Sequence, residues 1–401
     1  MKIGILSNRF IEWGGGIAFL QLCLQALENC SKKNNITVIL LMPKTKKYLF
    51  KNTVKTILNI FIFRKFKIKN IIKDSYIIDQ LVNSVNIKVK LVRYNNTIYD
   101  LEQTARKEDI DILLPSFENL GKNFIIPWIG YIYDFQHKEM PEYFTEKDIK
   151  SRDVDFLNMI LNSKSILVNS EKVKSDINKY LEYKTDNIFA LPFTPFSNKR
   201  NSGSPLSIFS KYNISGKYFV IANQFWRHKD HLTAFIAFAY FCTINSEYQL
   251  VCTGDLSDYR NPSYMHMLKD VLTSNSIENK VIFTGFLKKV EMLLIIENAI
   301  CLIQPTIYEG GPGGGAVYDA YSYGIPILLS DIEINDEVID CGNIIRFEKQ
   351  NANDLFHKMQ LAIAKEKVDY SIIKDFILTA NEDLGDILYD AIVKTIQKKD
   401  T

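Results

Sequence analysis

The sequence has few of the features that mark secreted, zinc-binding or nucleic-acid-binding proteins. Its six cysteines include no C-x-x-C pair and lie inside apolar runs. This pattern argues against a disulfide framework or a zinc site and indicates small core residues in a reducing compartment. The net charge of +3 is too small to indicate nucleic-acid binding.

Long hydrophobic runs are also lacking. Met1–Ser7 is too short for a signal peptide and is predicted to be a first strand. The longest candidates for a membrane span, Ile36–Met42 and Ile57–Phe63, fall far below about 18 residues. We therefore expect a cytoplasmic protein, either soluble or peripheral on the inner face of the plasma membrane.

The chain alternates apolar strands with helical segments, and it changes composition once, at the proline- and serine-rich stretch 192–205. This alternation predicts an α/β fold of two doubly wound, Rossmann-like parallel-sheet domains, with any ligand in the cleft between them. The expected boundaries are a first domain over 1–195, a linker over 196–214, a second domain over 215–375, and a C-terminal helical segment over 376–401 that packs back on the first domain.

Residues 44–73 carry ten lysines or arginines and no acid, with apolar residues such as Phe61, Phe63 and Phe66 between them. Basic residues around an apolar stripe are attracted to anionic membrane surfaces. A solvated lysine-rich face is an equally good interpretation, and both remain open.

Two glycine-rich stretches each lie between a predicted strand and a predicted helix. In Tyr308–Ala320, five of the 18 glycines fall within residues 310–315, with Glu309 and Asp319 on either side. Such a turn gathers N–H groups and the positive end of a helix dipole, which favours a phosphate, while the two acids favour hydroxyl groups. Gly14–Gly16 forms a second such stretch, although glycines of this kind more often form only a tight turn.

Another group of polar residues follows the predicted strand 127–133 and includes Asp134 and His137. Functional side chains of open α/β sheets lie at this end of the strands. A lone histidine is more often structural than catalytic, but its place in this group favours a functional role.

Four segments together resemble retaining glycosyltransferases of the GT-B fold, specifically glycosyltransferase family 4 (glycosyl transferases group 1). They are Gly14–Gly16, Tyr133–His137 with Pro141 and Glu142, Asn223–His231, and Tyr308–Ala320 with Gly324–Pro326. Val168–Glu171 is similar to the strand–serine–helix element that ends the first domain in this family. The resemblance covers nearly the whole chain.

The resemblance implies a nucleotide-diphosphate sugar as donor, with no cofactor and no metal. It implies that Lys229 neutralises the donor diphosphate, that Glu309 lies beside the donor sugar or its phosphate, and that Asp319 binds the ribose hydroxyls. It also implies that Gly15, Gly16 and Asp134 border the donor phosphate and the acceptor. The expected catalytic residues are Glu309 and His137, where His137 contacts the sugar at the reacting centre. Further donor contacts are expected from Gln224, Arg227, Gly311, Gly313, Gly314, Gly315 and Ala316.

The sequence departs from the family pattern in three places. Gln224 replaces an arginine that precedes the lysine, so one of two phosphate-binding cations is missing unless Arg227 substitutes for it. Nine residues separate Glu309 from Asp319, against seven in the family, and the second acid is an aspartate. Tyr133 replaces a histidine before Asp134.

The leading hypothesis is a metal-independent, retaining hexosyl-type glycosyltransferase that acts on a glycan or lipid-linked glycan during surface polysaccharide or lipopolysaccharide synthesis. An epimerase or phosphorylase of the same fold is an alternative, as is a degenerate partner subunit without activity. We expect no nucleic-acid partner. The residues do not distinguish between donor bases or between sugars.

Overall fold

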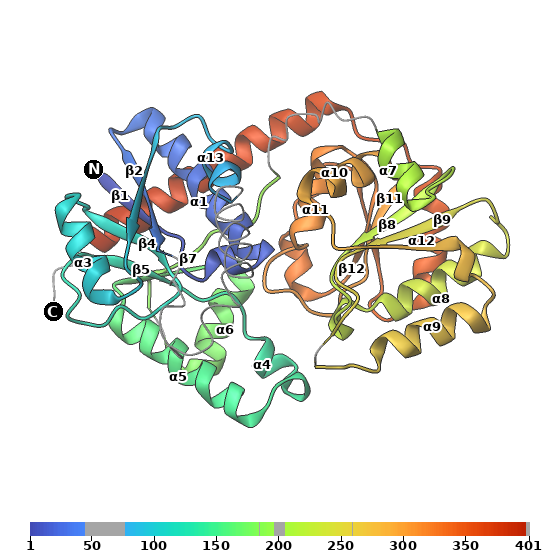
Figure 1. Ribbon diagram of the computed structural model, residues 1–401, viewed down its shortest axis with the longest axis horizontal. Helices are drawn as coiled ribbons and strands as arrows, with labels where there is room; N and C mark the ends of the chain where they lie inside the picture. The colour runs from blue at the N-terminus through green and yellow to red at the C-terminus, as the bar shows by residue number, and fades with distance from the viewer. Residues whose placement is uncertain (45–76, 184, 196–204, 259, 398–401) are drawn as a thin grey trace, which may run out of the picture.

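The computed structural model describes residues 1–44, 77–183, 185–195, 205–258 and 260–397. These residues form two α/β domains side by side, each with a parallel sheet between layers of helices (Figure 1). Apart from Lys44, the basic segment 44–73 lies outside the described residues, so its proposed contact with a membrane stays a prediction.

The first domain has a seven-stranded sheet in which every pair of neighbouring strands is parallel. Its inner strands are continuous apolar runs because helices cover both faces. In spatial order the strands are β3 (Val89–Tyr94), β2 (Thr37–Pro43), β1 (Lys2–Leu6), β4 (Ile112–Ser116), β5 (Trp128–Tyr131), β6 (Ser165–Val168) and β7 (Ile188–Ala190).

Two buried clusters cover the faces of this sheet. One contains side chains of α1, residues 77–85 and the C-terminal helix α13, and the other contains side chains of α3, α5 and α6. The helical elements are η1 (Phe10–Glu12), α1 (Gly14–Lys33), α3 (Ile98–Lys107), α4 (Gln136–Glu139), η2 (Pro141–Tyr143), α5 (Glu146–Asn162), α6 (Glu171–Leu181) and α13 (Tyr370–Gln397).

The second domain has a six-stranded parallel sheet, with α8, α9 and α12 on one face and α7, α10 and α11 on the other. In spatial order its strands are β10 (Val281–Gly285), β9 (Gln249–Thr253), β8 (Tyr218–Ala222), β11 (Cys301–Gln304), β12 (Ile327–Ser330) and β13 (Ile344–Phe347). Its helical elements are α7 (Pro205–Tyr212), η3 (Arg227–Lys229), α8 (His231–Cys242), α9 (Tyr264–Ser274), η4 (Glu278–Lys280), α10 (Lys289–Asn298), α11 (Gly315–Ser322), η5 (Glu333–Glu337) and α12 (Ala352–Ile363).

The predicted fold class, two Rossmann-like parallel-sheet domains, is confirmed. Strand β3 was not predicted from the sequence, because this edge strand is largely exposed and carries Lys90 and Arg93 among its apolar residues. Helix α7 lies within the stretch expected to be a linker, and its Ile208 is buried in the second domain.

All six cysteines lie within the described residues, and each is a free thiol. Burial raises the pKa of the Cys23, Cys252 and Cys301 thiols far above the usual value, so these residues are unreactive parts of the core. None of the helices in the described part of the chain has the length and apolar content needed to cross a bilayer.

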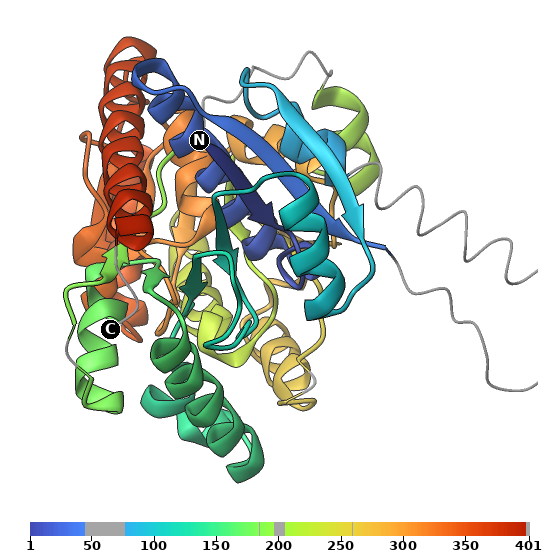
Figure 2. The same ribbon diagram turned by 90° about the vertical axis from the view of Figure 1, so that its left-hand side faces the viewer.

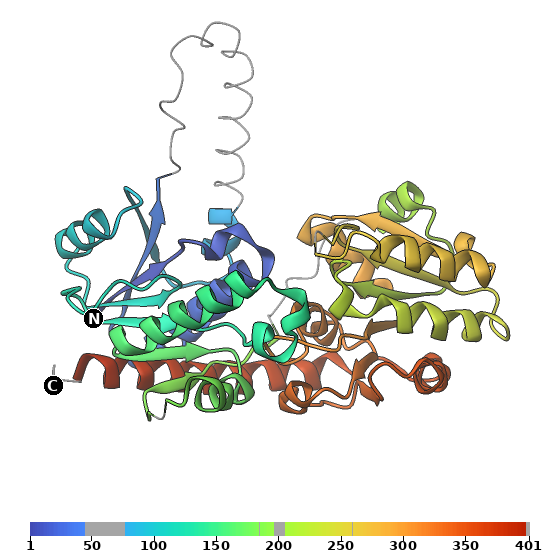
Figure 3. The ribbon, with the colours of Figure 1, turned by 90° about the horizontal axis from the view of Figure 1, so that it is seen from below.

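Helix α13 begins on the second domain and ends on the first. Figures 2 and 3 show it as the long red helix that runs along the first domain. Its Ile373 and Ile377 are buried in the second domain, whereas Leu384 and Leu388 are buried against α1. Gly385 permits this close packing, because a Cβ there would lie 3.0 Å from the Cβ of Asn29.

We predict that Leu388→Ala lowers the free energy of unfolding by about 2–5 kcal/mol, because Leu388 is fully buried in the core that α13 completes. Leu378→Ala is the matched control, since Leu378 lies on the same helix but is 51% exposed, and it should change stability by no more than about 0.5 kcal/mol. Denaturant unfolding followed by tryptophan fluorescence measures both variants. If Leu388→Ala changed the free energy of unfolding as little as Leu378→Ala does, this part of α13 would not stabilise the first domain.

Candidate functional site

Two loops of the second domain carry the polar residues that the sequence singled out. One follows β8 and contains Lys229, and the other follows β11 and contains Glu309. Because β8 and β11 are parallel neighbours, their carboxyl ends lie at the same edge of the sheet and the two loops meet there.

The loops are joined by a buried ion pair. Lys229 Nζ lies 2.5 Å from Glu309 Oε1, and the two side chains are only 13% and 10% exposed. Gln304, the last residue of β11, donates its Nε2–H to the same carboxylate oxygen at 2.9 Å. Asn223 Nδ2 in turn donates to Gln304 Oε1 at 2.8 Å. A carboxylate only accepts hydrogen bonds, so this chain of contacts fixes the orientation of the Gln304 amide.

Backbone contacts hold the two loops in register. The carbonyl of His228 accepts hydrogen bonds from Ile307 N at 2.9 Å and from Thr306 Oγ1 at 3.2 Å. Ser330 Oγ, at the end of β12, donates to the Thr306 carbonyl at 2.6 Å. The Lys229–Glu309 pair therefore rests on a rigid edge built from three neighbouring strands.

The glycine-rich stretch has two parts with different surroundings. Gly310 and Gly311 face the first domain: a Cβ on Gly310 would lie 3.0 Å from the Asp134 Cβ, and one on Gly311 would lie 2.9 Å from the Phe193 ring. Gly313 and Gly314 adopt positive φ angles, 66° and 72°, which turn the chain into α11.

Among the amides predicted to hold a phosphate, Gly313 N donates to Asn335 Oδ1 at 2.8 Å and Gly314 N to the Pro312 carbonyl at 2.7 Å. The N–H groups of Gly315 and Ala316 lie in the first turn of α11, where an intrahelical acceptor does not exist. The part of the loop suited to an anion is thus the start of α11 itself.

Asp319, predicted to bind ribose, is paired within the protein. Both of its carboxylate oxygens accept from Lys289 Nζ, at 2.7 and 2.5 Å, and its side chain is 3% exposed. Burial raises the pKa of the Asp319 carboxyl, and the positive charge of Lys289 opposes this shift. A direct contact between Asp319 and a ribose would require Lys289 to share or leave this carboxylate.

The side chains of Gln224 and Arg227 are both exposed on the loop after β8. The Arg227 backbone is anchored by Asp258, whose Oδ2 accepts from Arg227 N at 3.0 Å. The structure therefore brings Lys229 and Glu309 into direct contact, while Arg227 is held nearby through its backbone alone.

In the first domain, Gly15 and Gly16 lie at the start of α1 under the indole of Trp13. A Cβ on Gly15 would lie 2.2 Å from the indole ring, and one on Gly16 would lie 2.3 Å from the Phe10 carbonyl oxygen. Packing against the Phe10 backbone thus requires Gly16, whereas a side chain on Gly15 would displace the 43% exposed Trp13 indole and Gly14 has open space around it.

Helix α4 contains His137 and begins two residues after Asp134, and it lies on the side of the first domain that faces the second (Figure 1). Asp134 Oδ1 accepts from Arg152 Nη2 at 2.8 Å. The His137 ring is fully buried, and its Nε2 lies 3.0 Å from Asp153 Oδ1. Burial and the charge of Arg152 lower the His137 pKa, so the neutral ring donates Nε2–H to Asp153 and keeps Nδ1 as an acceptor.

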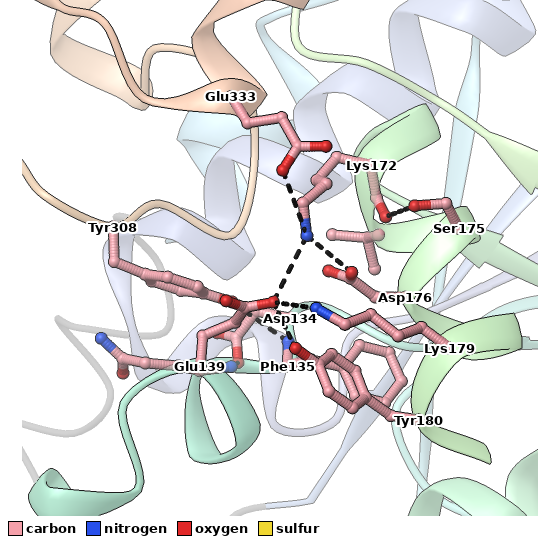
Figure 4. Close-up of polar contacts among 12 residues, drawn as sticks. Asp134, Phe135, Glu139, Lys172, Ser175, Asp176, Lys179, Tyr180, Tyr308 and Glu333 are labelled. Carbon is pink, nitrogen blue, oxygen red and sulfur yellow. Dashed lines mark hydrogen bonds and ion pairs between the residues drawn. The ribbon is translucent and has the colours of Figure 1, made fainter.

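Contacts between the domains surround this region. Tyr308 Oη accepts from Phe135 N at 3.1 Å, and Asn169 Nδ2 donates to the Gly310 carbonyl at 3.3 Å. Figure 4 shows Lys172 of α6 between Asp176, Glu139 and the second-domain residue Glu333, with Nζ–O distances of 2.6, 3.5 and 3.9 Å.

Glu337 of the second domain reaches the start of α6 in the first. Its two oxygens accept from Glu171 N at 2.9 Å and Lys172 N at 2.8 Å. A carboxylate at a helix N-terminus satisfies unpaired N–H groups and interacts favourably with the helix dipole. This contact ties the two domains together on one side of the site.

The sequence analysis missed several residues of the site. Gln304 had a detectable signal, because it is a polar residue at the end of an apolar strand. Asn223 begins the family-like segment Asn223–His231, but its contact with Gln304, 81 residues away, had no signal in the sequence. Lys289 had none either, since its partner Asp319 is 30 residues away. Within the described residues, no group of three or more His, Cys, Asp or Glu is arranged to hold a metal ion.

Comparison with known proteins extends these observations. Residues 207–375 match the model of the family described as Glycosyl transferases group 1. No curated protein sequence matched the chain. All six strands of the second domain lie within the matched range, which begins inside helix α7.

Several solved structures share the fold of the whole chain. HepE from Anabaena in complex with UDP has a TM-score of 0.65 at 14% identity and covers 97% of this chain and 100% of that chain. A glycosyltransferase from Rickettsia africae has a TM-score of 0.62 at 12% identity, over 99% of each chain. The lipopolysaccharide outer core galactosyltransferase WaaB has a TM-score of 0.56 at 16% identity, over 98% and 99%. The chain therefore has the two-domain fold of these glycosyltransferases, and its second domain matches the group 1 family model.

Proposed function

We propose that the protein is a glycosyltransferase that moves a sugar from a nucleotide-diphosphate sugar to a glycan or lipid-linked glycan. The observation that carries the proposal is the Lys229–Glu309 pair beside the N-terminus of α11. The match of residues 207–375 to a glycosyltransferase family model supports it. A UDP-sugar is the first donor to test, because the similar structure of HepE contains UDP.

Donor binding would redistribute the charges of the site. Lys229 now neutralises Glu309, and an incoming diphosphate would compete for the ammonium group. When Lys229 turns to the phosphate, Glu309 keeps its hydrogen bond from Gln304 and becomes available to accept a hydroxyl of the donor sugar. One binding event would thus orient both ends of the donor.

Departure of the nucleotide builds negative charge on its terminal phosphate. Lys229 and the N–H groups of Gly315 and Ala316 would stabilise that charge, and preorganised donors of this kind lower the barrier most effectively. In a retaining transfer, the leaving phosphate oxygen would help to deprotonate the acceptor hydroxyl on the same face, so no nucleophile from the protein is required. The first domain, through Asp134, would border the acceptor, whereas the fully buried His137 ring would have to move to reach it.

The proposal is tested by thermal shift with a panel of UDP-, GDP- and ADP-sugars and their free nucleoside diphosphates. A bound donor should raise the melting temperature by mass action, and a hydrolysed or transferred sugar should then be detected. Net transfer with retained anomeric configuration, read by NMR, supports a retaining transferase. Conversion of the donor without transfer would indicate the epimerase or phosphorylase alternative, and no stabilisation by any ligand would contradict all the enzyme hypotheses.

Lys229→Ala should weaken binding of the stabilising nucleoside diphosphate about tenfold or more, because it removes a charge-assisted contact to phosphate. Lys269→Ala is the matched control, since Lys269 is exposed on α9. Calorimetric titration of both variants gives the comparison. If the two variants bind equally well, Lys229 does not contact the diphosphate.

Gln304→Leu should lower kcat about tenfold while the affinity for the nucleoside diphosphate changes less than about twofold. Gln304 donates a hydrogen bond to Glu309, so its loss should misplace the carboxylate that meets the sugar. Gln304→Glu should be more harmful than Gln304→Leu, because it places a second carboxylate beside Glu309. A parallel loss of kcat and nucleotide affinity in Gln304→Leu would instead indicate a general disturbance of the loop.

The proposal also includes peripheral attachment to an anionic membrane through residues 44–73 and a role in surface polysaccharide synthesis. Vesicles containing anionic lipid should bind the protein at low salt and release it at high salt, because the attraction is electrostatic. A variant with Lys65, Lys67 and Lys69 changed to Glu should bind less. Absence of binding by the unchanged protein at low salt would remove the membrane part alone.

A further inference from the structure

Lys289 is the first residue of α10, and its ammonium group makes an ion pair with Asp319 on α11. The two partners differ in exposure: the Asp319 side chain is 3% exposed, whereas that of Lys289 is 40% exposed. An ammonium group has three N–H bonds, and Lys289 directs hydrogen bonds to both oxygens of Asp319. The acid is therefore buried behind the lysine, and the lysine is the group that a ligand can reach.

The position of Asp319 on α11 shows where this ion pair lies. Helical side chains lean toward the N-terminus and cover the residues three and four positions earlier. For Asp319 these are Ala316 and Gly315, whose N–H groups begin the helix. A Cβ added to Gly315 would have nothing within 4 Å, so there is open space on this face of the first turn. The Lys289–Asp319 pair thus lies on the same face of α11 as Gly315, whose N–H group begins the helix.

The negative charge of a nucleoside diphosphate is larger than Lys229 alone can neutralise. A nucleoside diphosphate carries more than one negative charge, and Lys229 is the cation beside Glu309. Gln224 is neutral and exposed, and Arg227, two residues before Lys229, is an exposed cation whose backbone N–H is anchored by Asp258. Lys289 reaches α11 from the start of α10, whereas Lys229 comes from the segment after β8, so the two lysines are supplied by different elements.

Building on the proposed function, we propose that Lys289, positioned by Asp319, is a second phosphate-binding cation of the donor site. Lys229 and Lys289 would hold the diphosphate between them at the N-terminus of α11. Asp319 then acts as a positioning residue that orients Lys289, instead of meeting the ribose directly. The ligand class is a nucleoside diphosphate, and the recognised group is its phosphate and not its base.

The test compares a nucleoside diphosphate with its nucleoside. Calorimetric titrations with UDP and uridine, and likewise GDP with guanosine and ADP with adenosine, identify the pair that the unchanged protein binds. For that pair, Lys289→Met should weaken diphosphate binding about tenfold to a hundredfold and leave nucleoside binding within about twofold. Lys289→Arg should retain most of the affinity. Lys288→Met, which removes the adjacent exposed lysine, is the matched control and should have little effect.

Lys289→Met leaves Asp319 buried without its partner, which alone can destabilise a domain. The double variant Lys289→Met/Asp319→Asn removes both charges and keeps the volume of both side chains. If Lys289 binds phosphate, the double variant remains weak for the diphosphate and normal for the nucleoside. Recovery of diphosphate affinity in the double variant, or equal losses for diphosphate and nucleoside, would show that the ion pair only supports the fold. If the unchanged protein binds no nucleoside diphosphate, the proposed function itself fails, and the inference about Lys289 fails with it.

Discussion

The close approach of Gly310 and Gly311 to the first domain is the constraint on which the site depends. A Cβ on Gly310 would crowd Asp134 and the Tyr133 carbonyl oxygen, each 3.0 Å away, and a side chain on Gly311 would meet Phe193 and Asn169. Any larger residue at these positions would separate the domains or displace the loop. The main role of these two glycines is therefore to let the domains pack closely. In the chain, Glu309 precedes this contact and the start of α11 follows it.

Two lysine–carboxylate pairs dominate the electrostatics beside α11. Glu309 is 10% exposed and Asp319 is 3% exposed. Leaving such a carboxylate buried without its partner is strongly unfavourable, whereas an intact buried pair contributes little net stability. The two pairs keep this edge of the sheet neutral, and our proposal assigns the binding of the diphosphate to the same edge. A diphosphate would replace carboxylate oxygens with phosphate oxygens around cations that are already in place.

The domains are held together from two directions. Helix α13 belongs to both hydrophobic cores, since its first turns pack in the second domain and its later turns pack on α1. On another side, Glu337 caps α6 and Tyr308 accepts from the backbone at Phe135. The apolar contacts of α13 are extensive and nondirectional, whereas the polar contacts near the site are few and directional. Relative movement of the domains would break the polar contacts more readily than those of α13.

The sequence by itself determined the two parallel sheets, because continuous apolar runs bounded by glycine and polar residues are a local pattern. It also placed Lys229 after the end of β8 and Glu309 after the end of β11. Because β8 and β11 are neighbours in the sheet, the two residues meet. Only the tertiary structure decided which groups these residues contact. Gln304, Asn223 and Lys289 complete the site through partners distant in the chain, and such pairings depend on how helices and strands pack. The same packing decided that Asp319 faces Lys289 and that Gly310 and Gly311 face the first domain, which no spacing along the chain could specify.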